Sequence, residues 1–186
     1  GLAASRFMRH HFDEPVVGYM NRELEVAHLD TPVEQLARAM HARNVSGLPI
    51  LDGKQDLVGV VTRTDLVRLG LIQAGRRPSD RAMPLPHRRA SEVMTVGPAT
   101  VTSATSLRHA ACVMIYLDVH RVFVMEGGKL AGVLCATDVT AAVREARIID
   151  PVASVMTSPI LSIDVHGTLG TAMDLLDRAH VTGLIV

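Results

Sequence analysis

One turn of the sequence combines two hydroxyls and a carboxylate between an apolar run and an amphipathic run. Val60 and Val61 belong to a β-branched stretch that predicts a short buried strand ending at Thr62. Thr64 and Asp65 then open a segment with helical spacing. The N-terminus of a helix offers free N–H groups and the positive end of the helix dipole, which favour an anion. The turn could hold phosphate while Asp65 accepts both hydroxyls of a ribose. Helix capping is the alternative, because Thr and Asp are common cap residues.

The same turn occurs a second time. Gly132 opens an apolar stretch that ends at Cys135, and Thr137 and Asp138 begin the next amphipathic segment. Because order and spacing match the first turn, the chain is expected to contain an internal repeat. Cys135 stands where the first turn has Thr62, so the second turn lacks one hydroxyl.

The repeat extends well beyond these turns. Three segments align without gaps from Met20, Met94 and Met156. At the same distance from each methionine, a Pro, Ser or Thr precedes an amphipathic segment whose apolar stripe predicts a helix. In the first copy Thr31 is the expected cap, with Glu34 completing a capping box. Two apolar runs joined by Asp52-Gly53 or Gly127-Gly128 predict hairpins.

Each complete copy is therefore predicted to be an α+β unit with a small three-stranded sheet and two helices. The expected divisions are a tail over residues 1–14, a first repeat over 15–75, a linker over 76–88, a second repeat over 89–147 and a partial third repeat over 150–186. A unit of this size cannot bury its sheet alone. Two units paired face to face by a pseudo-two-fold axis would bury it and leave clefts between them, lined by the two turns.

Composition limits the classes of function. The 186 residues carry a formal net charge of +0 and only 3% aromatic residues, which argues against a nucleic-acid partner. Basic side chains between Arg76 and Arg89 keep nucleic-acid binding open as a minor alternative. No metal cluster, catalytic triad or phosphate-binding glycine loop is visible, so the chain is not expected to be an enzyme. No apolar run is long enough to span a membrane. The expected location is cytoplasmic, or the cytoplasmic face of a membrane protein if the sequence is part of a longer one.

The order Val45-Ser46-Gly47-Leu48-Pro49, Asp52-Gly53 and Leu57–Leu66 resembles the CBS domain, and the likeness covers about residues 15–186. The segment Val119-His120-Arg121-Val122 is similar to a repeat of the gamma subunit of AMP-activated protein kinase. CBS domains occur as tandem pairs that bind adenosine-containing ligands and regulate an attached or partner protein. The resemblance implies an energy-sensing regulatory module, with an adenine nucleotide (AMP, ADP or ATP) as ligand and no catalytic cofactor.

The resemblance also assigns roles to individual residues. Arg121 and His120 would contact ligand phosphate beside Thr137, Asp138 would hold the ribose, and Val45 and Ser46 of the facing repeat would lie near the adenine. The first repeat has Ser46-Gly47 where the second has His120-Arg121. The cleft around Asp65, Thr62 and Thr64 therefore has less positive charge and could take adenosine or S-adenosylmethionine. The full predicted set is Val45, Ser46, Thr62, Thr64, Asp65, His120, Arg121, Cys135, Thr137 and Asp138.

Two other functions fit the same repeats. A structural dimerisation module could fill its clefts with side chains and bind nothing. An S-adenosylmethionine-binding regulatory domain of a larger enzyme or transporter would use the same cleft for another adenosine compound. A homodimer through the CBS disc is expected in each case.

Overall fold

The computed structural model describes residues 12–73, 87–146, 151–154, 156, 158–179, 181 and 183–186. The chain divides into two compact units, residues 1–148 and 149–186. Most of the predicted tail and of the predicted linker lies outside the described residues. Among the helices that are described, none combines the length and the apolar character needed to cross a membrane.

The first sheet has the order β1-β2-β3-β4. Strand β1 (Ala27–His28) runs parallel to β2 (Gly47–Leu51), and β2 forms an antiparallel hairpin with β3 (Leu57–Thr62). Helix α2 (Val33–Ala42) packs on this sheet through Val33, Leu36 and Met40, which recur at helical spacing and are at most 1% exposed. Helix α3 (Arg63–Gln73) follows β3 directly.

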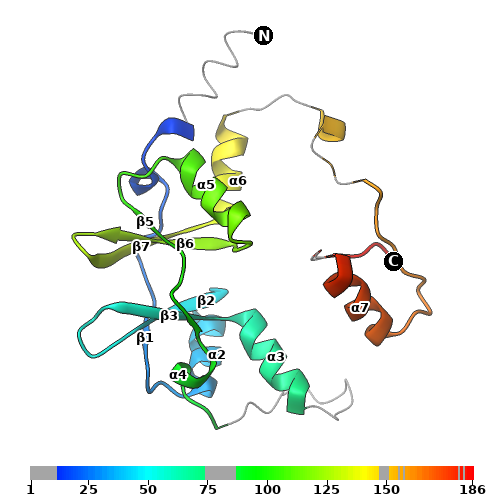
Figure 1. The fold of residues 1–186 in the computed structure, drawn as a ribbon, viewed down its shortest axis with the longest axis horizontal. Helices are drawn as coiled ribbons and strands as arrows, with labels where there is room; N and C mark the ends of the chain where they lie inside the picture. Colours follow the sequence, from blue (N-terminus) through cyan, green and yellow to red (C-terminus); the bar gives the residue numbers. More distant parts are fainter. Residues whose placement is uncertain are drawn as a thin grey trace. The chain divides into compact units, whose positions relative to one another are not determined.

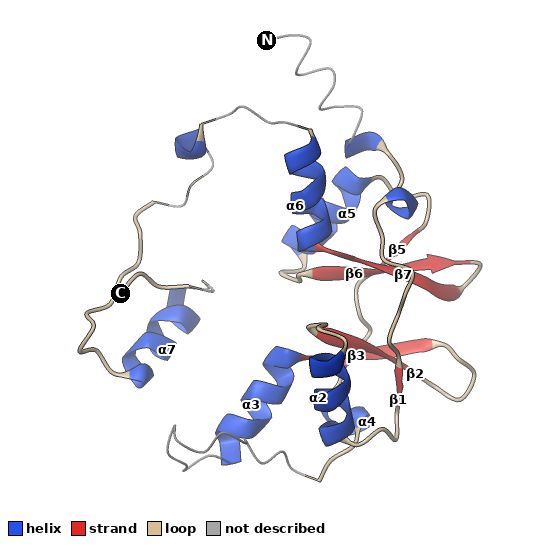
Figure 2. Cartoon of the chain, turned by 180° about the vertical axis from the view of Figure 1, so that it is seen from behind, coloured by secondary structure: helices blue, strands red, loops and turns tan. Residues whose placement is uncertain are grey.

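The second sheet repeats this arrangement in the order β5-β6-β7. Strand β5 (Thr100–Thr102) is parallel to β6 (Arg121–Glu126), which is antiparallel to β7 (Lys129–Cys135). Helices α5 (Leu107–Tyr116) and α6 (Ala136–Glu145) complete the unit. Figure 1 shows the two sheets facing each other, with α5 and α6 outside one sheet and α2 and α3 outside the other. The view from behind in Figure 2 shows the same layers, so both predicted α+β units are present.

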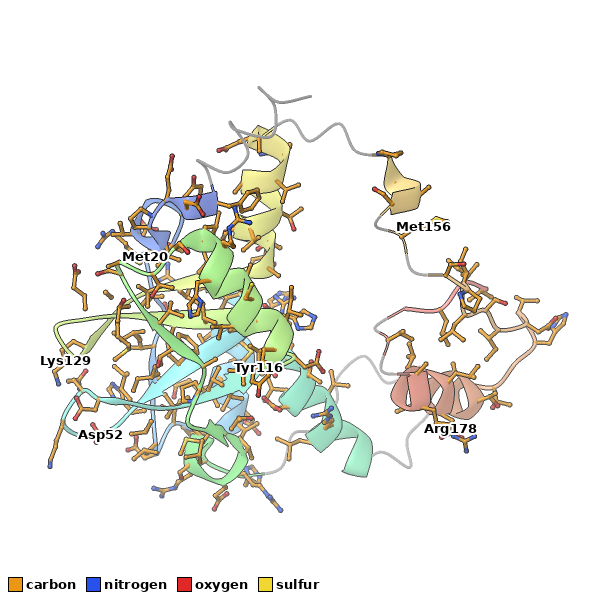
Figure 3. The ribbon with its side chains drawn as sticks, turned by 45° about the horizontal axis from the view of Figure 1, so that its top comes forward. Met20, Asp52, Tyr116, Lys129, Met156 and Arg178 are labelled. Carbon is orange, nitrogen blue, oxygen red and sulfur yellow. The ribbon has the colours of Figure 1, made fainter. Side chains whose placement is uncertain are left out.

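The two methionine-bearing segments are exchanged between the repeats. The segment with the 3-10 helix η1 (Val16–Gly18) and Met20 lies on the second repeat, where Asn21 N–H donates to Val133 O at 2.9 Å. Figure 3 shows Met20 beside this repeat. A Cβ at Gly132 would collide with the Met20 sulfur, so glycine permits this approach. The order of elements along the chain did not predict the exchange.

The opposite segment makes the reciprocal contact. Helix α4 (Ala90–Val93), Met94 and strand β4 (Thr95–Val96) pack on the first repeat, and β4 pairs with β3. A Cβ at Gly59 would collide with the Met94 sulfur, as at Gly132. The first sheet therefore has a fourth strand in addition to the three that were predicted. Each hydrophobic core therefore contains residues from both repeats of the sequence.

The predicted capping of the first helix is wrong. Pro32, not Thr31, is the N-cap of α2 and makes no side-chain hydrogen bond there. Thr31 Oγ1 instead accepts a hydrogen bond of 3.0 Å from His28 N–H. Thr31 thus closes the turn between β1 and α2. The local sequence does not distinguish this role of a threonine from that of an N-cap.

Residues 149–186 form a separate small unit with the 3-10 helix η2 (Val152–Ser154) and helix α7 (Leu169–Ala179). A parallel bridge joins Ser162 and Ile185. With Met156 aligned on Met94, this bridge corresponds to the Thr100–Phe123 pair of the second repeat. Thr168 Oγ1 accepts from Thr171 N–H at 3.1 Å, as Ser106 does from His109. The assignment as a partial third repeat stays a prediction.

Candidate functional site

Arg121 connects the two repeats at the start of β6. Its Nη2 donates a hydrogen bond of 2.8 Å to the Ser46 hydroxyl, which belongs to the first repeat. Beside it, a Cβ added at Gly47 would lie 2.9 Å from the Arg121 guanidinium carbon. The guanidinium therefore lies against the backbone of the facing repeat, on the side where the sequence predicted the nucleotide cleft.

Cys135 lies next to this guanidinium. It ends β7 directly opposite Arg121 in the antiparallel ladder. Burial raises the pKa of the Cys135 thiol, the Arg121 charge lowers this pKa, and the Asp138 carboxylate raises it. Both charged groups thus act on the same thiol, which brings Arg121, Cys135 and Asp138 into one neighbourhood.

Asp138 holds the N-terminus of α6. Its Oδ2 accepts a hydrogen bond of 2.7 Å from Cys135 N–H, and the Cys135 side chain accepts from Asp138 N–H in return. The carboxylate is half-buried, whereas Thr137 and His120 are exposed. The capping alternative is therefore realised at this turn. Because capping engages Oδ2, Oδ1 is the oxygen to which a ligand hydroxyl could donate.

The first turn has the same capping geometry with one more hydrogen bond. Asp65 Oδ2 accepts from Thr62 N–H at 2.8 Å and from Thr62 Oγ1 at 2.7 Å. Thr64 is exposed, and Arg63 N–H donates to Ser46 O at 3.0 Å. In the second turn the thiol of Cys135 takes the place of the Thr62 hydroxyl, which here donates to Asp65.

The predicted residues thus fall into two groups. One group comprises Ser46, Arg121, Cys135 and Asp138, with His120 and Thr137 next to them in the chain. The other comprises Thr62 and Asp65, with Thr64 between them. Val45 is half-buried against the first core, and its N–H donates to Met40 O at 3.0 Å. Its predicted place near an adenine stays a prediction.

Sequence reasoning did not single out two residues that join the repeats. Gly47 is one, and its place opposite Arg121 in the repeat alignment is the signal that could have found it. Lys129 is the other. Its Nζ binds Asp56 Oδ1 at 2.7 Å and Lys54 O at 3.0 Å, which ties the two hairpin tips together. In Figure 3 Lys129 lies close to Asp52 of the facing hairpin. No sequence pattern indicates this pairing.

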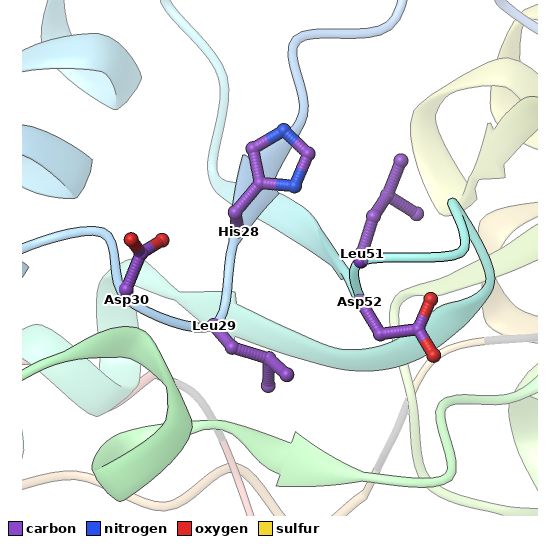
Figure 4. A pocket seen from close by; sticks show the side chains of 6 residues that line it. His28, Leu29, Asp30, Leu51 and Asp52 are labelled. Carbon is purple, nitrogen blue, oxygen red and sulfur yellow. The ribbon is translucent and has the colours of Figure 1, made fainter.

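A separate hollow lies at the edge of the first repeat. Its volume is about 340 Å³, and its lining is His28, Leu29, Asp30, Leu51, Asp52 and Gly53 (Figure 4). Hydrogen bonds from Asp56 N–H and Lys54 N–H lower the pKa of Asp52, so this carboxylate already serves the hairpin turn. No group of three potential metal ligands occurs in the part of the chain that the structure describes. The hollow contains none of the predicted nucleotide-binding residues.

The two thiols are expected to react at different rates. Cys112 is exposed on α5, whereas burial raises the pKa of Cys135. Because the thiolate is the nucleophile, iodoacetamide at pH 8 should alkylate Cys112 first and Cys135 more than about ten-fold slower. Peptide mass spectrometry over time measures both rates in the same sample. Equal rates in the folded protein would contradict the position of Cys135, and denaturant should abolish the difference.

Comparison with known proteins agrees with the duplicated architecture. The family model described as "CBS domain" matches residues 16–71 and again residues 90–145, together more than half of the chain. The chain belongs to the CBS-domain family. This identification confirms the resemblance inferred from the repeated motifs, and the structure confirms the α+β fold class of a tandem CBS pair.

Solved CBS-domain structures share the fold. CBSX2 in complex with AMP is 26% identical with a TM-score of 0.60, and the match covers 71% of this chain and 97% of CBSX2. The CBS domain pair of protein MJ0100, in complex with 5'-methylthioadenosine and S-adenosyl-L-methionine, is 20% identical with a TM-score of 0.60. That match covers 70% of this chain and 96% of the MJ0100 pair.

Curated relatives match over shorter stretches. The L-aspartate semialdehyde sulfurtransferase of Methanocaldococcus jannaschii is 42% identical over 50 residues, which are 27% of this chain and 10% of the enzyme. A CBS domain-containing protein of Dictyostelium discoideum is 51% identical over 39 residues, which are 21% of this chain and 27% of that protein. The chain thus spans only a small part of the length of these relatives.

Proposed function

We propose that the two complete repeats form a regulatory module that binds an adenosine-containing nucleotide of the AMP, ADP or ATP class in the cleft between them. The observation that carries this proposal is the 2.8 Å hydrogen bond from Arg121 Nη2 to Ser46 Oγ. It places the guanidinium cation of the second repeat against the first repeat. Arg suits phosphate oxygens since its planar group can donate two parallel hydrogen bonds.

The rest of the site supplies complementary groups. The N-terminus of α6 lies beside Arg121 and favours an anion, and the exposed Thr137 hydroxyl is in its first turn. Oδ1 of Asp138 accepts a ribose hydroxyl in this proposal, while Oδ2 keeps the helix cap. His120 precedes Arg121 and adds a second donor to phosphate. The AMP complex of CBSX2 supports this ligand class.

S-adenosylmethionine is the second candidate ligand, and the first turn favours it. Thr62, Thr64 and Asp65 offer hydroxyls and a carboxylate, and the corresponding strand position is Gly47 rather than a basic residue. The first turn supplies no basic strand residue of its own, although the Arg121 guanidinium of the second repeat lies against Gly47, which pairs with Thr62. The MJ0100 complex with 5'-methylthioadenosine and S-adenosyl-L-methionine supports this alternative.

Isothermal titration calorimetry with AMP, ADP, ATP, S-adenosylmethionine and 5'-methylthioadenosine tests the proposal. We expect a phosphate-bearing compound to bind most tightly. Thermal unfolding provides a second readout, because a ligand at 100 times its Kd stabilises the folded state by about 2.7 kcal/mol. The absence of heat and of a thermal shift with every compound would favour the structural dimerisation module.

The proposed module regulates rather than catalyses. The CBS pair in this family is a regulatory unit, and its ligand would alter an attached or partner effector protein in response to cellular nucleotide levels. We place this activity in the cytoplasm, or on the cytoplasmic face of a membrane protein, because adenine nucleotides are available there. No nucleic-acid partner is proposed.

We further propose that the module forms a homodimer through the outward face of α5. Ile115 and Tyr116 are 80% and 87% exposed at the end of this helix, where Figure 3 shows Tyr116. The matched positions on α2 are His41 and Ala42, so the apolar character is confined to the second repeat. A second copy would bury the α5 surface, which is otherwise costly to expose to water.

Sedimentation velocity tests the dimer. Ile115→Glu should convert it to a monomer, because a charge buried at the interface costs several kcal/mol. His41→Glu at the matched position on α2 is the control and should leave the dimer intact. A monomeric wild-type protein at tens of micromolar, or loss of the dimer in the control alone, contradicts this interface.

A further inference from the structure

Gly47 occupies a position where glycine has no backbone reason to be. It lies in β2 opposite Thr62, and it is not among the described residues with positive φ. Glycine weakens a strand interior and often marks the close approach of another group. Here the approaching group is the Arg121 side chain, since an added Cβ would collide with Nη1 and lie 2.9 Å from Cζ.

Gly47 and Arg121 are equivalent positions of the two repeats. In the hairpin ladders, Gly47 pairs with Thr62 and Arg121 pairs with Cys135. One repeat supplies the guanidinium, and the other supplies the space that it enters. A side chain on both positions would compete for the same volume between the two repeats, so the asymmetry has a steric cause.

We propose that Gly47 is a specificity-determining residue of this cleft, which selects ligands with a phosphate by letting the Arg121 guanidinium lie against the first repeat. This inference rests on the proposed nucleotide function. The space at Gly47 sets where the cation stands: between the Ser46 hydroxyl and the Cys135–Asp138 turn, next to the N-terminus of α6. A guanidinium displaced from this position no longer faces the phosphate that the same turn would hold.

The substitution Gly47→Ala separates this role from general folding. Its methyl group meets the end of a flexible side chain and, at 3.1 Å, the carbonyl oxygen of Val61. The Arg121 side chain can move away from the added methyl group, and the backbone at Val61 needs to shift only by a few tenths of an ångström. We expect the affinity for AMP to fall about ten-fold in Gly47→Ala, while the affinity for adenosine, which lacks phosphate, changes less than about two-fold.

Calorimetry with AMP and adenosine compares four variants with the wild type. Gly53→Ala is the matched control, because a Cβ there meets no atom within 4 Å, and it should bind both compounds normally. Arg121→Ala should lose the preference for AMP. In the double variant of Gly47→Ala and Arg121→Ala the added methyl group meets no guanidinium, so it should bind AMP no more weakly than Arg121→Ala alone. If Gly47→Ala fails to fold, the double variant should fold again, because removing the guanidinium frees the space of the added methyl group; if both fail to fold, the inference is wrong.

The outcomes distinguish this inference from the proposed function. If Gly47→Ala keeps the wild-type ratio of AMP to adenosine affinity while Arg121→Ala loses it, Gly47 has no role in specificity and the nucleotide function stands. If Gly47→Ala weakens both compounds equally, it distorts the cleft, and the inference is also wrong. If the wild type binds neither compound, both the inference and the nucleotide function fail.

Discussion

Arg121→Ala is expected to lower the affinity for AMP about 10- to 100-fold and to leave the affinity for adenosine nearly unchanged. A hydrogen bond to a charged group contributes about 1.5–3 kcal/mol, and about 1.4 kcal/mol corresponds to ten-fold in affinity. The loss should be confined to phosphate-bearing ligands, because Arg121 Nη2 donates to the Ser46 hydroxyl, whereas the predicted ribose carboxylate of Asp138 accepts from Cys135 N–H. Calorimetric titration with each compound measures it.

Asp138→Asn is the complementary change. Its side-chain oxygen can still accept the cap hydrogen bond from Cys135 N–H, so the thermal midpoint should fall only slightly. The ribose loses an anionic acceptor, and we expect AMP and adenosine to weaken by a similar factor of about ten. Ser103→Ala, whose hydroxyl binds Glu126 at the opposite end of β6, is a control that should bind normally. Wild-type affinities in both Arg121→Ala and Asp138→Asn would remove this site assignment.

Met20→Ala is expected to destabilise the protein by about 2–5 kcal/mol, the usual range for truncating a buried methionine. Met20 is 8% exposed and belongs to the core of the second repeat, although in the chain it lies within the first repeat. Urea unfolding measures the loss. Met173→Ala on α7 is the control, because its side chain is 49% exposed and should contribute little.

Hydrogen exchange locates this effect. In Met20→Ala, protection should fall in β6 and β7 of the second repeat before it falls in β2 and β3 of the first. If the first repeat lost protection instead, the exchange of segments would be wrong. A uniform loss across both sheets would mean that the two repeats unfold as one cooperative unit and that the site cannot open one repeat at a time.

Much of the fold follows from local patterns. The hairpin between β2 and β3 was predicted from two β-branched runs around Asp52-Gly53, and β3 has its predicted limits at Leu57 and Thr62. The apolar stripe of α2 is buried as its spacing indicates. These features depend on residues close in sequence, which is why periodicity and turn chemistry are sufficient to predict them.

The exchange of segments could not be predicted in this way. Met20 and Met94 stand at equivalent positions of similar repeats, so either sheet offers each of them a similar surface next to a glycine. The choice depends on how the two repeats pack, which is a long-range property. Lys129 and Asp56 meet for the same reason, because each lies at the tip of a hairpin from a different repeat.

The candidate site falls between these cases. The resemblance to a known repeat family placed Ser46 and Arg121 on facing repeats, and the structure brings their side chains within 2.8 Å. The capping role of Asp65 and Asp138 was open in the sequence, since the same residues suit a cap and a ribose. Gly47 was noted only as a missing basic residue, because its contact with the Arg121 guanidinium depends on how the two repeats pack.

An NMR titration with AMP tests the central claim most directly. With assigned amide signals, we predict saturable shifts at Ser46, Gly47, Arg121 and Asp138, on both sides of the cleft. Shifts confined to the hollow around His28 and Asp52, or no shifts at millimolar AMP, would contradict the claim that these repeats hold a nucleotide between them.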